Sequence, residues 1–372
     1  MTRHLADIVA RSNTRRLALV GLTKNVGKTT TTNHLLAALI DEGFFQAGEL
    51  ALTSLGLDGE AVDALTGLAK PRYVPQPGVL VATTVDLLRQ AEQEGMQVER
   101  LAQLAGRTAL GPVVLARVLR PGRIVVAGPT LLRDLRSALD RMQQYGARLS
   151  IVDGAINRLG AASPGITGAC ILCTGASLAA TPELVARRTA DILARLMVQP
   201  SRWKDAYRQR YPQARLLVFS SDSDRDESAE VFRGSTEPAA GAQWIVARML
   251  THQQPVFLLR GAFTEELSRE LLAQLSRHTL PTQAEIVVGD GTKIFCHSVV
   301  LQRLAARSLH LRVAEPVRIL ALSINPYTPE YTCTPQRLLD ALARALPAPH
   351  PPIIDVVSGL HKDGFYSGVQ KY

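Results

Sequence analysis

The chain has 372 residues, 46% of them hydrophobic and 20% charged, which is enough apolar material for two domains or one large α/β domain. No segment approaches the roughly 18 to 20 consecutive apolar residues of a membrane-spanning helix, and no low-complexity tract indicates disorder, so both of these protein classes are disfavoured. The net charge of +9 raises nucleic acid as a partner, but only seven of the 42 basic residues are lysines, and the scattered arginines argue against a nucleic-acid surface.

Short β-rich runs alternate with helical patterns through the first half of the chain. A strand over 16–21 precedes an amphipathic helix over about 29–42, with Gly43 as its expected C-cap. Further strands are expected over 49–55, 78–84, 148–152 and 169–174, a hairpin over 113–127, and helices over 131–145 and from Thr181 onward. Strands that alternate with helices predict parallel βαβ units, and so an α/β fold with a mainly parallel sheet flanked by helices.

The alternation weakens between residues 199 and 253 and then resumes. The stretch 220–228 is rich in serine and aspartate, and 234–238 has the composition of a loop, so an insertion or a domain boundary is expected in this region. Strands over 256–259, 285–288, 318–324 and 353–357 are then expected to alternate with helices over 265–277, 298–307 and 335–346. The second half of the chain is therefore also predicted to be α/β.

The four cysteines are too few for a disulfide framework in so long a chain. Cys170 and Cys173 have the spacing of a metal or redox motif, but they lie in an apolar run that is expected to be a buried strand. Residues three apart on a strand point to opposite faces, so these two thiols are not expected to share a metal ion. Reduced core cysteines, and with them a cytoplasmic location, are expected.

The segment from Gly21 to Thr29, Gly-Leu-Thr-Lys-Asn-Val-Gly-Lys-Thr, matches G-x-x-x-x-G-K-[ST], the phosphate-binding loop. It follows an apolar strand and precedes an amphipathic helix, a context in which backbone N–H groups and the helix N-terminus bind phosphate. Lys28 is expected to reach the β- and γ-phosphates of ATP, and the Thr29 hydroxyl to bind Mg²⁺. The expected nucleotide-binding residues of the loop are Gly21, Lys24, Asn25, Val26, Gly27, Lys28, Thr29 and Thr30. The alternative is a chance glycine-rich turn.

Carboxylates at two expected strand ends complete the predicted magnesium site. Asp153 ends an apolar run, as the acid of a Walker B segment does, and would orient Mg²⁺ directly or through water; a strand-end turn is the alternative. Asp58 follows the second expected strand and would hold Mg²⁺-bound water or activate an acceptor, although a surface turn also fits. Glu60 fits a helix start equally well. Ligands of open parallel sheets bind at the carboxyl ends of the strands, where these groups and Gly128-Pro129 and Thr174-Gly175 are expected to meet.

Further polar residues are candidates at the same rim. In dimeric ATPases with a deviant phosphate loop, a signature lysine would occupy position 23, where this chain has a threonine and Lys24 follows. Lys24 is expected to contact phosphate, a co-substrate anion or a partner subunit, or else to be a solvated loop residue. Lys70 and Arg72 fit either a basic rim or a linker. Asn325, followed by Pro326, would hydrogen-bond adenine through its amide or start an Asn-Pro turn.

The motif and the composition together predict five regions. These are an N-terminal arm (1–14), a P-loop NTPase domain (15–200), a polar insertion or linker (201–254), a C-terminal α/β domain (255–357) and a flexible tail (358–372). The eight histidines have neither H-x-x-x-H nor H-E-x-x-H spacing, so no zinc site is expected.

The loop resembles that of dethiobiotin synthetase and related ATP-dependent enzymes. A longer resemblance depends on an ordered set of segments: 21–30, 53–60, 70–72, 122–129, 152–158, 174–176, 261–264, 324–326 and 354–356. This set resembles the P-loop reactivase subunit associated with lysine 5,6-aminomutase, an adenosylcobalamin- and pyridoxal-phosphate-dependent enzyme, and leaves residues 200–250 unmatched. The resemblance implies an ATPase that helps to replace damaged cobalamin in the aminomutase, together with a second, MutS-like subunit. The chain lacks the cobalamin-ligating D-x-H-x-x-G signature, so it should act on the holoenzyme.

Two other functions are open at this point. An ATP-dependent small-molecule ligase of the dethiobiotin synthetase type would bind an anionic acceptor at Lys24, Asp58, Lys70 and Arg72. A regulatory or nucleic-acid-associated NTPase fits the positive charge but not its dispersal. ATP is expected as the nucleotide, with GTP as the alternative, and the oligomeric state, including a homodimer, is left open.

Overall fold

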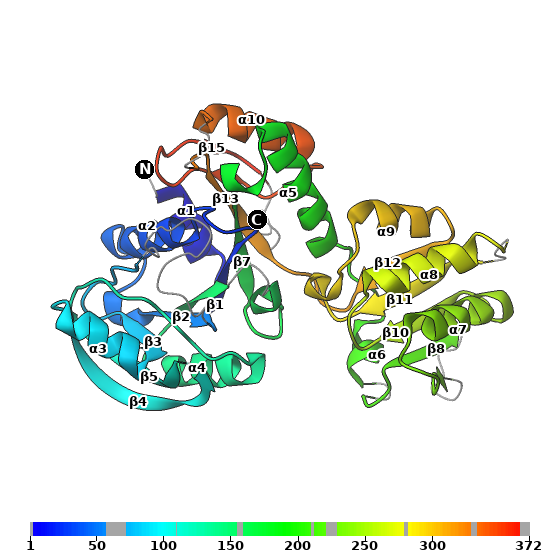
Figure 1. Ribbon diagram of the computed structural model, residues 1–372, viewed down its shortest axis with the longest axis horizontal. Coiled ribbons are helices and arrows are strands. Elements are labelled where there is room, and N and C mark those ends of the chain that lie inside the picture. Colours follow the sequence, from blue (N-terminus) through cyan, green and yellow to red (C-terminus); the bar gives the residue numbers. More distant parts are fainter. Residues whose placement is uncertain are drawn as a thin grey trace. The chain divides into compact units, whose positions relative to one another are not determined.

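The computed structural model describes residues 3–56, 72–108, 110–154, 159–209, 212–220, 229–278, 282–328 and 333–364. The chain forms two compact units: Met1–Ala190 with Arg318–Tyr372, and Asp191–Val317. Each unit has its own β-sheet and its own hydrophobic core, and both sheets carry helices (Figure 1). The predicted α/β class is therefore confirmed.

A ten-stranded sheet forms the centre of the first unit, in the order β15-β14-β13-β7-β1-β6-β2-β3-β5-β4. The strands from β14 to β3 pair in parallel, whereas β5, β4 and β15 join through antiparallel pairs. Its strands are β1 (Arg16–Gly21), β2 (Leu50–Leu55), β3 (Leu80–Thr84), β4 (Gln97–Thr108), β5 (Gly111–Arg120), β6 (Leu149–Gly154), β7 (Ala169–Gly175), β13 (Ile319–Asn325), β14 (Ile353–Ile354) and β15 (His361–Lys362). Its helices are α1 (Arg3–Arg11), α2 (Lys28–Asp41), α3 (Val85–Gln93), α4 (Leu132–Gln144) and α10 (Pro335–Ala345), and α5 (Pro182–Leu196) begins in this unit.

Helices cover both faces of this sheet, which explains why its central strands are apolar throughout. In β1, Leu17 and Leu19 belong to a core cluster with α1, α2 and α3, while the intervening Ala18 and Val20 are equally buried but lie outside that cluster. Successive strand residues point to opposite faces, so the second pair faces the other helical layer. The buried residues of α4, such as Leu135 and Leu139, belong to that opposite side. The central strands are thus held rigidly from both sides.

The expected N-terminal arm is a packed helix. Residues Leu5, Ile8 and Val9 of α1 are almost completely buried and belong to the same core cluster as α2. Their i, i+3, i+4 spacing gives α1 a single apolar stripe, which packs into the core of the first unit. The stripe is short and lies among charged residues, so the composition of this segment does not reveal a packed helix.

Replacing Ile8 with alanine should therefore destabilise the protein. We expect a loss of about 2–5 kcal/mol in the free energy of unfolding, because the substitution opens a cavity in a core that closes over Ile8. Chemical denaturation followed by circular dichroism measures it. The matched control is Arg11→Ala in the same helix, where the side chain is 68% exposed and a change of under about 0.5 kcal/mol is expected. Equal effects of the two substitutions would show that α1 is a solvated arm.

The hairpin lies elsewhere than expected. It is formed by β4 and β5, whereas the segment 123–127 contributes only an isolated bridge between Ile124 and Tyr73. The sequence of β4 mixes charged residues, glycine and alanine with few β-branched residues, which gives it a weak strand signal. It is the edge strand of the sheet, where pairing with β5 along most of its length compensates for that weak propensity.

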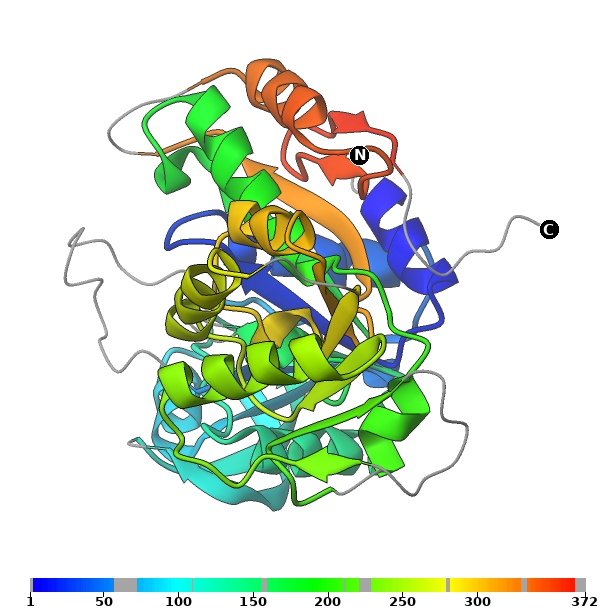
Figure 2. The ribbon, with the colours of Figure 1, turned by 90° about the vertical axis from the view of Figure 1, so that its right-hand side faces the viewer.

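The second unit has a five-stranded sheet in the order β12-β11-β10-β8-β9. Strands β10, β11 and β12 are parallel, and β8 and β9 are added by antiparallel pairing. Its strands are β8 (Leu216–Ser220), β9 (Glu230–Val231), β10 (Pro255–Leu259), β11 (Ala284–Val288) and β12 (Leu309–Val313), and its helices are α6 (Lys204–Gln209), α7 (Pro238–Thr251), α8 (Glu265–Leu275) and α9 (Ser298–Ala305). Buried residues of α7, α8 and α9 form one core with the strands. The ribbons of these helices, in yellow-green to gold, are seen in Figure 2.

The division of the chain differs from the predicted one in two respects. The expected linker, 201–254, contains α6, β8, β9 and α7, and Leu217 and Val218 of β8 are fully buried. The expected C-terminal domain, 255–357, is split, because β13 pairs with β7 of the first sheet. The second unit is thus inserted into the first. The order of elements along the chain places neighbouring elements in one domain. It does not show that β13 pairs with β7, which lies far away in the sequence.

Part of the expected flexible tail is also ordered. Strand β15 pairs antiparallel with β14, and Asp355 at the turn between them is 1% exposed. Its side-chain oxygens accept hydrogen bonds from the main-chain N–H of Val357 and from the Ser358 hydroxyl, so each of the two buried oxygens has a partner. Residues 365–372 lie outside the described residues.

The two cysteines with motif spacing are buried thiols on strand β7. Cys173 belongs to the core cluster that contains α2, and Cys170 does not, as expected for positions three apart on a strand. Burial raises the pKa of each thiol to about 12. Both thiols therefore stay protonated at neutral pH, and the prediction that they would not share a metal ion is consistent with their opposite faces.

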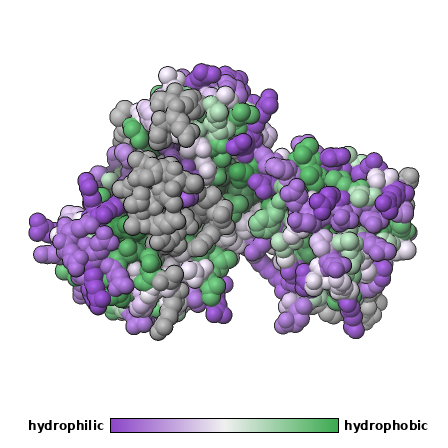
Figure 3. Space-filling view, in the orientation of Figure 1, coloured by the Kyte–Doolittle hydropathy of each residue, from purple (hydrophilic) through white to green (hydrophobic). Residues whose placement is uncertain are grey.

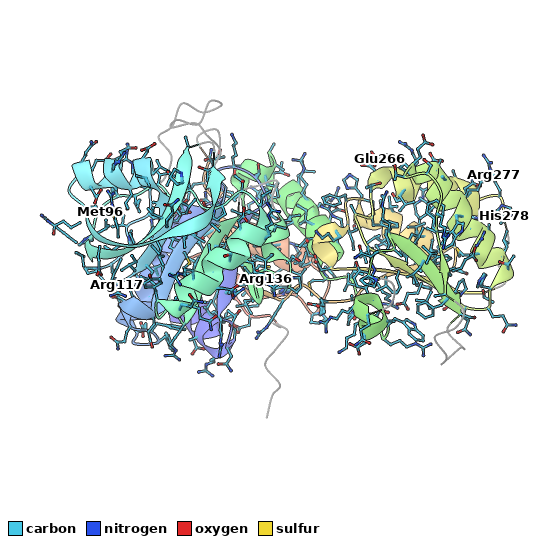
Figure 4. The ribbon with its side chains drawn as sticks, turned by 90° about the horizontal axis from the view of Figure 1, so that it is seen from below. Met96, Arg117, Arg136, Glu266, Arg277 and His278 are labelled. Carbon is cyan, nitrogen blue, oxygen red and sulfur yellow. The ribbon has the colours of Figure 1, made fainter. Side chains whose placement is uncertain are left out.

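The arginines are dispersed over separate elements, and many of them pair with acidic residues. Arg136 on α4 and Arg277 just beyond α8 are both exposed (Figure 4). Ion pairs join Arg16 to Asp140, Arg72 to Glu94, Arg100 to Glu92, Arg148 to Glu49, Arg208 to Glu315 and Arg248 to Glu230.

Hydrophilic residues are spread over the visible face of each unit (Figure 3). Among the described residues, no helix is both long and apolar enough to cross a membrane.

Candidate functional site

The loop that matches the phosphate-binding pattern connects the central strand β1 to helix α2. Two of its residues, Asn25 and Gly27, have positive φ angles of 59° and 78°. A side chain at Gly27 would be strained by this φ, and its Cβ would approach the Cβ of Asn325 to 3.1 Å. Val26 is 2% exposed and anchors the loop in the core. The second glycine of the motif is therefore required by the local geometry.

The N-terminus of α2 presents unpaired main-chain donors. Thr31 is the first residue whose N–H bonds back along the helix, to the carbonyl of Gly27 at 2.8 Å. Within the described part of the chain, the N–H groups of Lys28, Thr29 and Thr30 have no hydrogen-bond partner. The first turn of α2 also contains no acidic side chain. These donors and the helix dipole give the loop a positive potential that is suited to phosphate.

The side chain of Lys28 is held by the end of the neighbouring strand β6. Its ammonium forms an ion pair with the Asp153 carboxylate and donates a hydrogen bond to the carbonyl of Gly154 at 2.8 Å. Both side chains are largely buried, with 19% and 15% of their surface exposed. Strand β6 pairs with β1 in parallel, so the end of the loop strand and the carboxyl end of β6 lie side by side. The structure thus brings Lys28 and Asp153 together, as expected for a shared rim.

Tyr73 is a further member of this site. Its hydroxyl donates a hydrogen bond to the second carboxylate oxygen of Asp153. Its backbone is fixed by two hydrogen bonds with Ile124, of 2.9 and 3.0 Å. Burial, reinforced by the adjacent Asp153 carboxylate, raises the pKa of Tyr73 well above its usual range, and the Thr29 hydroxyl acts in the opposite direction. Tyr73 therefore remains a neutral donor that orients Asp153.

No local signal in the sequence identifies this tyrosine. It precedes a Val-Pro-Gln-Pro-Gly segment, and its only local feature is the basic residue before it. The contact with Asp153 depends on the bridge to Ile124, which joins two irregular segments far apart in the chain. Neither hydrophobic periodicity nor a catalytic motif could have identified it.

Asn325 positions the loop. Its side-chain N–H donates to the Asn25 carbonyl at 2.9 Å, and its side-chain oxygen accepts a hydrogen bond from the Tyr327 N–H at 3.2 Å. The amide that was expected to bind adenine is thus engaged by the protein on both sides. Pro326 is buried next to it, and its carbonyl accepts from the Cys333 N–H at 3.3 Å. The structural role of Asn325 is to hold Asn25 in its left-handed conformation.

Lys24 lies in the loop beside the end of β7. Its main-chain carbonyl accepts a hydrogen bond from the Ser177 hydroxyl at 2.8 Å, which ties the loop to the turn after β7. Of the other predicted basic residues, Arg72 forms an ion pair with Glu94. Asp58, Glu60 and Lys70 fall within 57–71, outside the described residues. The magnesium role predicted for Asp58 therefore stays a prediction.

Two glycines allow segments at the ends of the strands to pack closely. A Cβ at Gly128 would lie 1.9 Å from the Ser54 carbonyl oxygen, and a Cβ at Gly175 would lie 2.2 Å from that of Asn325. The Gly128 N–H also donates to the Ser54 hydroxyl at 2.9 Å. Side chains at either position would push apart the segments that each glycine lets approach. Gly175 ends β7, as expected, whereas Gly128 follows an irregular segment and lies beside the end of β2.

A separate cavity of about 280 Å³ lies in the second unit. Its lining includes Arg202, Trp203, Glu285, His310 and Arg312, at the starts of strands β10 and β11 and along β12. Its described lining residues belong to the second unit, so it is distinct from the loop site. Glu285 is the only acid among these described residues, and its carboxylate accepts a hydrogen bond from the Ser201 hydroxyl.

Comparisons with known protein families, with curated proteins and with solved structures find no match to this chain. The geometry of the loop and of its neighbouring strand ends is therefore the basis for assigning a function.

Proposed function

We propose that the chain is a P-loop NTPase that binds and hydrolyses ATP with Mg²⁺ at the loop between β1 and α2. The observation that carries the proposal is the ion pair of Lys28 with Asp153 beside the unpaired N–H groups of the α2 N-terminus. A lysine, a main-chain anion site and a carboxylate at the end of the adjacent parallel strand are the groups that nucleotide hydrolysis requires. GTP fits the same groups, because nothing in this contact set reads the base.

The residues of the site suit the metal as well as the phosphates. Thr29 supplies a hydroxyl and Asp153 a carboxylate, both oxygen ligands of the kind that Mg²⁺ prefers. When bound, Mg²⁺ would neutralise charge on the phosphate oxygens. Lys28 would then exchange its contact with Asp153 for a phosphate oxygen, and Tyr73 would keep the released carboxylate in position through its remaining hydrogen bond.

The cellular role that we propose is reactivation of a cobalamin-dependent aminomutase, and it rests on the family resemblance. Its support is that segment 324–326 contacts both 21–30 and 174–176, and all three segments help to carry the resemblance. Radical enzymes lose activity when damaged cobalamin stays in a closed active site. A nucleotide cycle can open such a complex if ATP- and ADP-bound states bind open and closed forms differently.

Hydrolysis assays with purified aminomutase test this role. The chain alone should hydrolyse ATP slowly, and faster with inactivated holoenzyme and the second, MutS-like subunit, with release of damaged cobalamin. No stimulation and no cobalamin exchange would reject the reactivase role while leaving ATP binding intact. Turnover that appears only with one added metabolite would support the ligase alternative. Stimulation by DNA or RNA that falls steeply with salt would support the nucleic-acid alternative.

Tyr73→Phe should raise the Mg²⁺ concentration needed for hydrolysis. The substitution removes the hydrogen bond that orients Asp153 but keeps the buried ring, so we expect the half-saturating Mg²⁺ concentration to rise by about 10-fold, as for other lost supports of metal ligands. ATP affinity without metal should change by less than about threefold. Tyr145→Phe, which removes a tyrosine hydroxyl bonded to the Leu101 carbonyl, is the control. An unchanged Mg²⁺ requirement in Tyr73→Phe would remove Tyr73 from the site.

A further inference from the structure

Two histidines from opposite ends of the sequence lie side by side in the first unit. His4 is in the first turn of α1 and His361 is in β15, and their rings are stacked with centroids 4.5 Å apart and planes at 27°. Asp363 lies next to both. Its Oδ1 atom is 3.9 Å from Nε2 of His4 and 4.0 Å from Nε2 of His361. One ligand atom from each of the three residues lies within 4.8 Å of the other two.

We propose that His4, His361 and Asp363 bind a divalent transition-metal ion, Zn²⁺ in the first place. Two imidazole nitrogens and one carboxylate oxygen form a donor set that Zn²⁺ accepts, whereas Mg²⁺ and Ca²⁺ favour sites made of oxygen. The ion would tie the N-terminal helix to the C-terminal hairpin. The site shares no residue with the loop site.

The orientation of His361 supports the assignment. Its Nδ1 is 3.4 Å from the carbonyl oxygen of Gly359, and a carbonyl can only accept, so Nδ1 carries the proton in that contact. In the neutral ring, Nε2 then has the free lone pair and faces Asp363. A hydrogen bond from the non-ligating nitrogen to a backbone carbonyl is the usual support of a metal-bound histidine.

The distances and the exposure fit an ion that closes the cluster. Tetrahedral Zn²⁺ with bonds of about 2.0–2.1 Å holds its donor atoms about 3.4 Å apart, so the Asp363 contacts with His4 and His361, now 3.9 and 4.0 Å, must shorten by about 0.5 and 0.6 Å. The side chain of Asp363 is 87% exposed, and those of His4 and His361 are 37% and 44% exposed. Rotation of these exposed side chains can turn the two rings out of their stack and point both Nε2 lone pairs at the ion, and solvent can supply the fourth ligand.

Metal binding at this site should stabilise the folded protein. The three donors are assembled only when α1 is packed and β15 is paired with β14, so an ion that binds them favours the folded state. A motif search does not find this site, because its ligands are separated by almost the whole sequence. The prediction that the chain has no zinc site depended on local spacing alone.

Zinc titration of the untagged full-length chain, stripped with EDTA and free of nucleotide, tests the proposal. We expect one Zn²⁺ per chain and a higher melting temperature with zinc than without. Asp363→Asn and His361→Ala should each weaken binding at least about 10-fold and abolish the thermal shift. The matched control is His278→Ala, an exposed histidine just beyond α8 (Figure 4), which should bind as the wild type does.

Two results would overturn the proposal. One is the absence of saturable zinc binding to the wild-type chain. The other is unchanged binding in both Asp363→Asn and His361→Ala, which would assign the zinc to other residues. Asp363→Asn keeps the test decisive if His361→Ala does not fold, because the highly exposed Asp363 side chain is not needed for packing. Lys28→Ala should leave the zinc titration unchanged. A negative zinc result would therefore not count against nucleotide binding at the loop, and a negative ATP result would not count against the zinc site.

Discussion

Lys28→Ala should lower the affinity for ATP by about 100-fold. Lys28 is the only cation that the described structure places against Asp153, and it lies beside the free N–H groups of the α2 N-terminus. Hydrogen bonds to charged groups contribute up to about 3 kcal/mol, which corresponds to roughly 100-fold in affinity. Calorimetric titration with ATP, with and without Mg²⁺, measures the effect.

The controls separate this effect from unfolding. Removing Lys28 leaves the largely buried Asp153 carboxylate without its cation, so some loss of stability is expected. The double variant Lys28→Ala/Asp153→Asn removes that charge and should recover stability without recovering ATP binding. Lys204→Ala, at an exposed lysine in α6, should bind ATP normally. Wild-type ATP affinity in folded Lys28→Ala would exclude the loop as the phosphate site.

Asp153→Asn separates binding from turnover. We expect hydrolysis with Mg²⁺ to fall by about 100-fold, an increase of about 2.7 kcal/mol in the activation free energy, because the amide is a poor ligand for the metal. ATP binding without Mg²⁺ should be unchanged or tighter, since Lys28 no longer has to leave a carboxylate partner. Steady-state hydrolysis over a range of Mg²⁺ concentrations, together with metal-free ATP titration, measures both quantities.

A second aspartate variant serves as the comparison. Asp140→Asn breaks an ion pair with Arg16 at a position where the aspartate side chain is 55% exposed, so neither hydrolysis nor ATP affinity should change. Normal turnover in Asp153→Asn would show that another group orients the metal. Asp58 would then be the first residue to test.

The part of the fold around the loop could be predicted from the sequence because its signals are local. The expected strand over 16–21 agrees with β1, and α2 begins one residue before the expected start at 29. An apolar run predicts β1, helical periodicity predicts α2, and a glycine predicts the turn between them, and each of these signals lies within a few residues. Strand β4, by contrast, is stabilised mainly by its partner, and β8 is a five-residue strand beside polar segments. Their own sequences carry too little information to identify them.

The residues of the site also divide into those with a local signal in the sequence and those without one. Lys28 and Asp153 were expected together because parallel neighbouring strands end at the same edge of a sheet. The roles of Tyr73 and Asn325 could not be assigned, since they depend on which distant backbone each one contacts. The insertion of residues 191–317 was missed for the same reason. Pairing between residues far apart in sequence leaves no local pattern.

Equilibrium titration of the untagged chain with ATP and Mg²⁺ is the decisive experiment for nucleotide binding at the loop. We expect one ATP bound per chain, competition by ADP but not by adenosine, and strongly weakened binding in Lys28→Ala. This competition pattern is expected because the Lys28 ammonium and the free N–H groups of α2 would bind phosphate and not the base. No saturable binding at millimolar ATP, or binding that adenosine displaces and Lys28→Ala preserves, would contradict it.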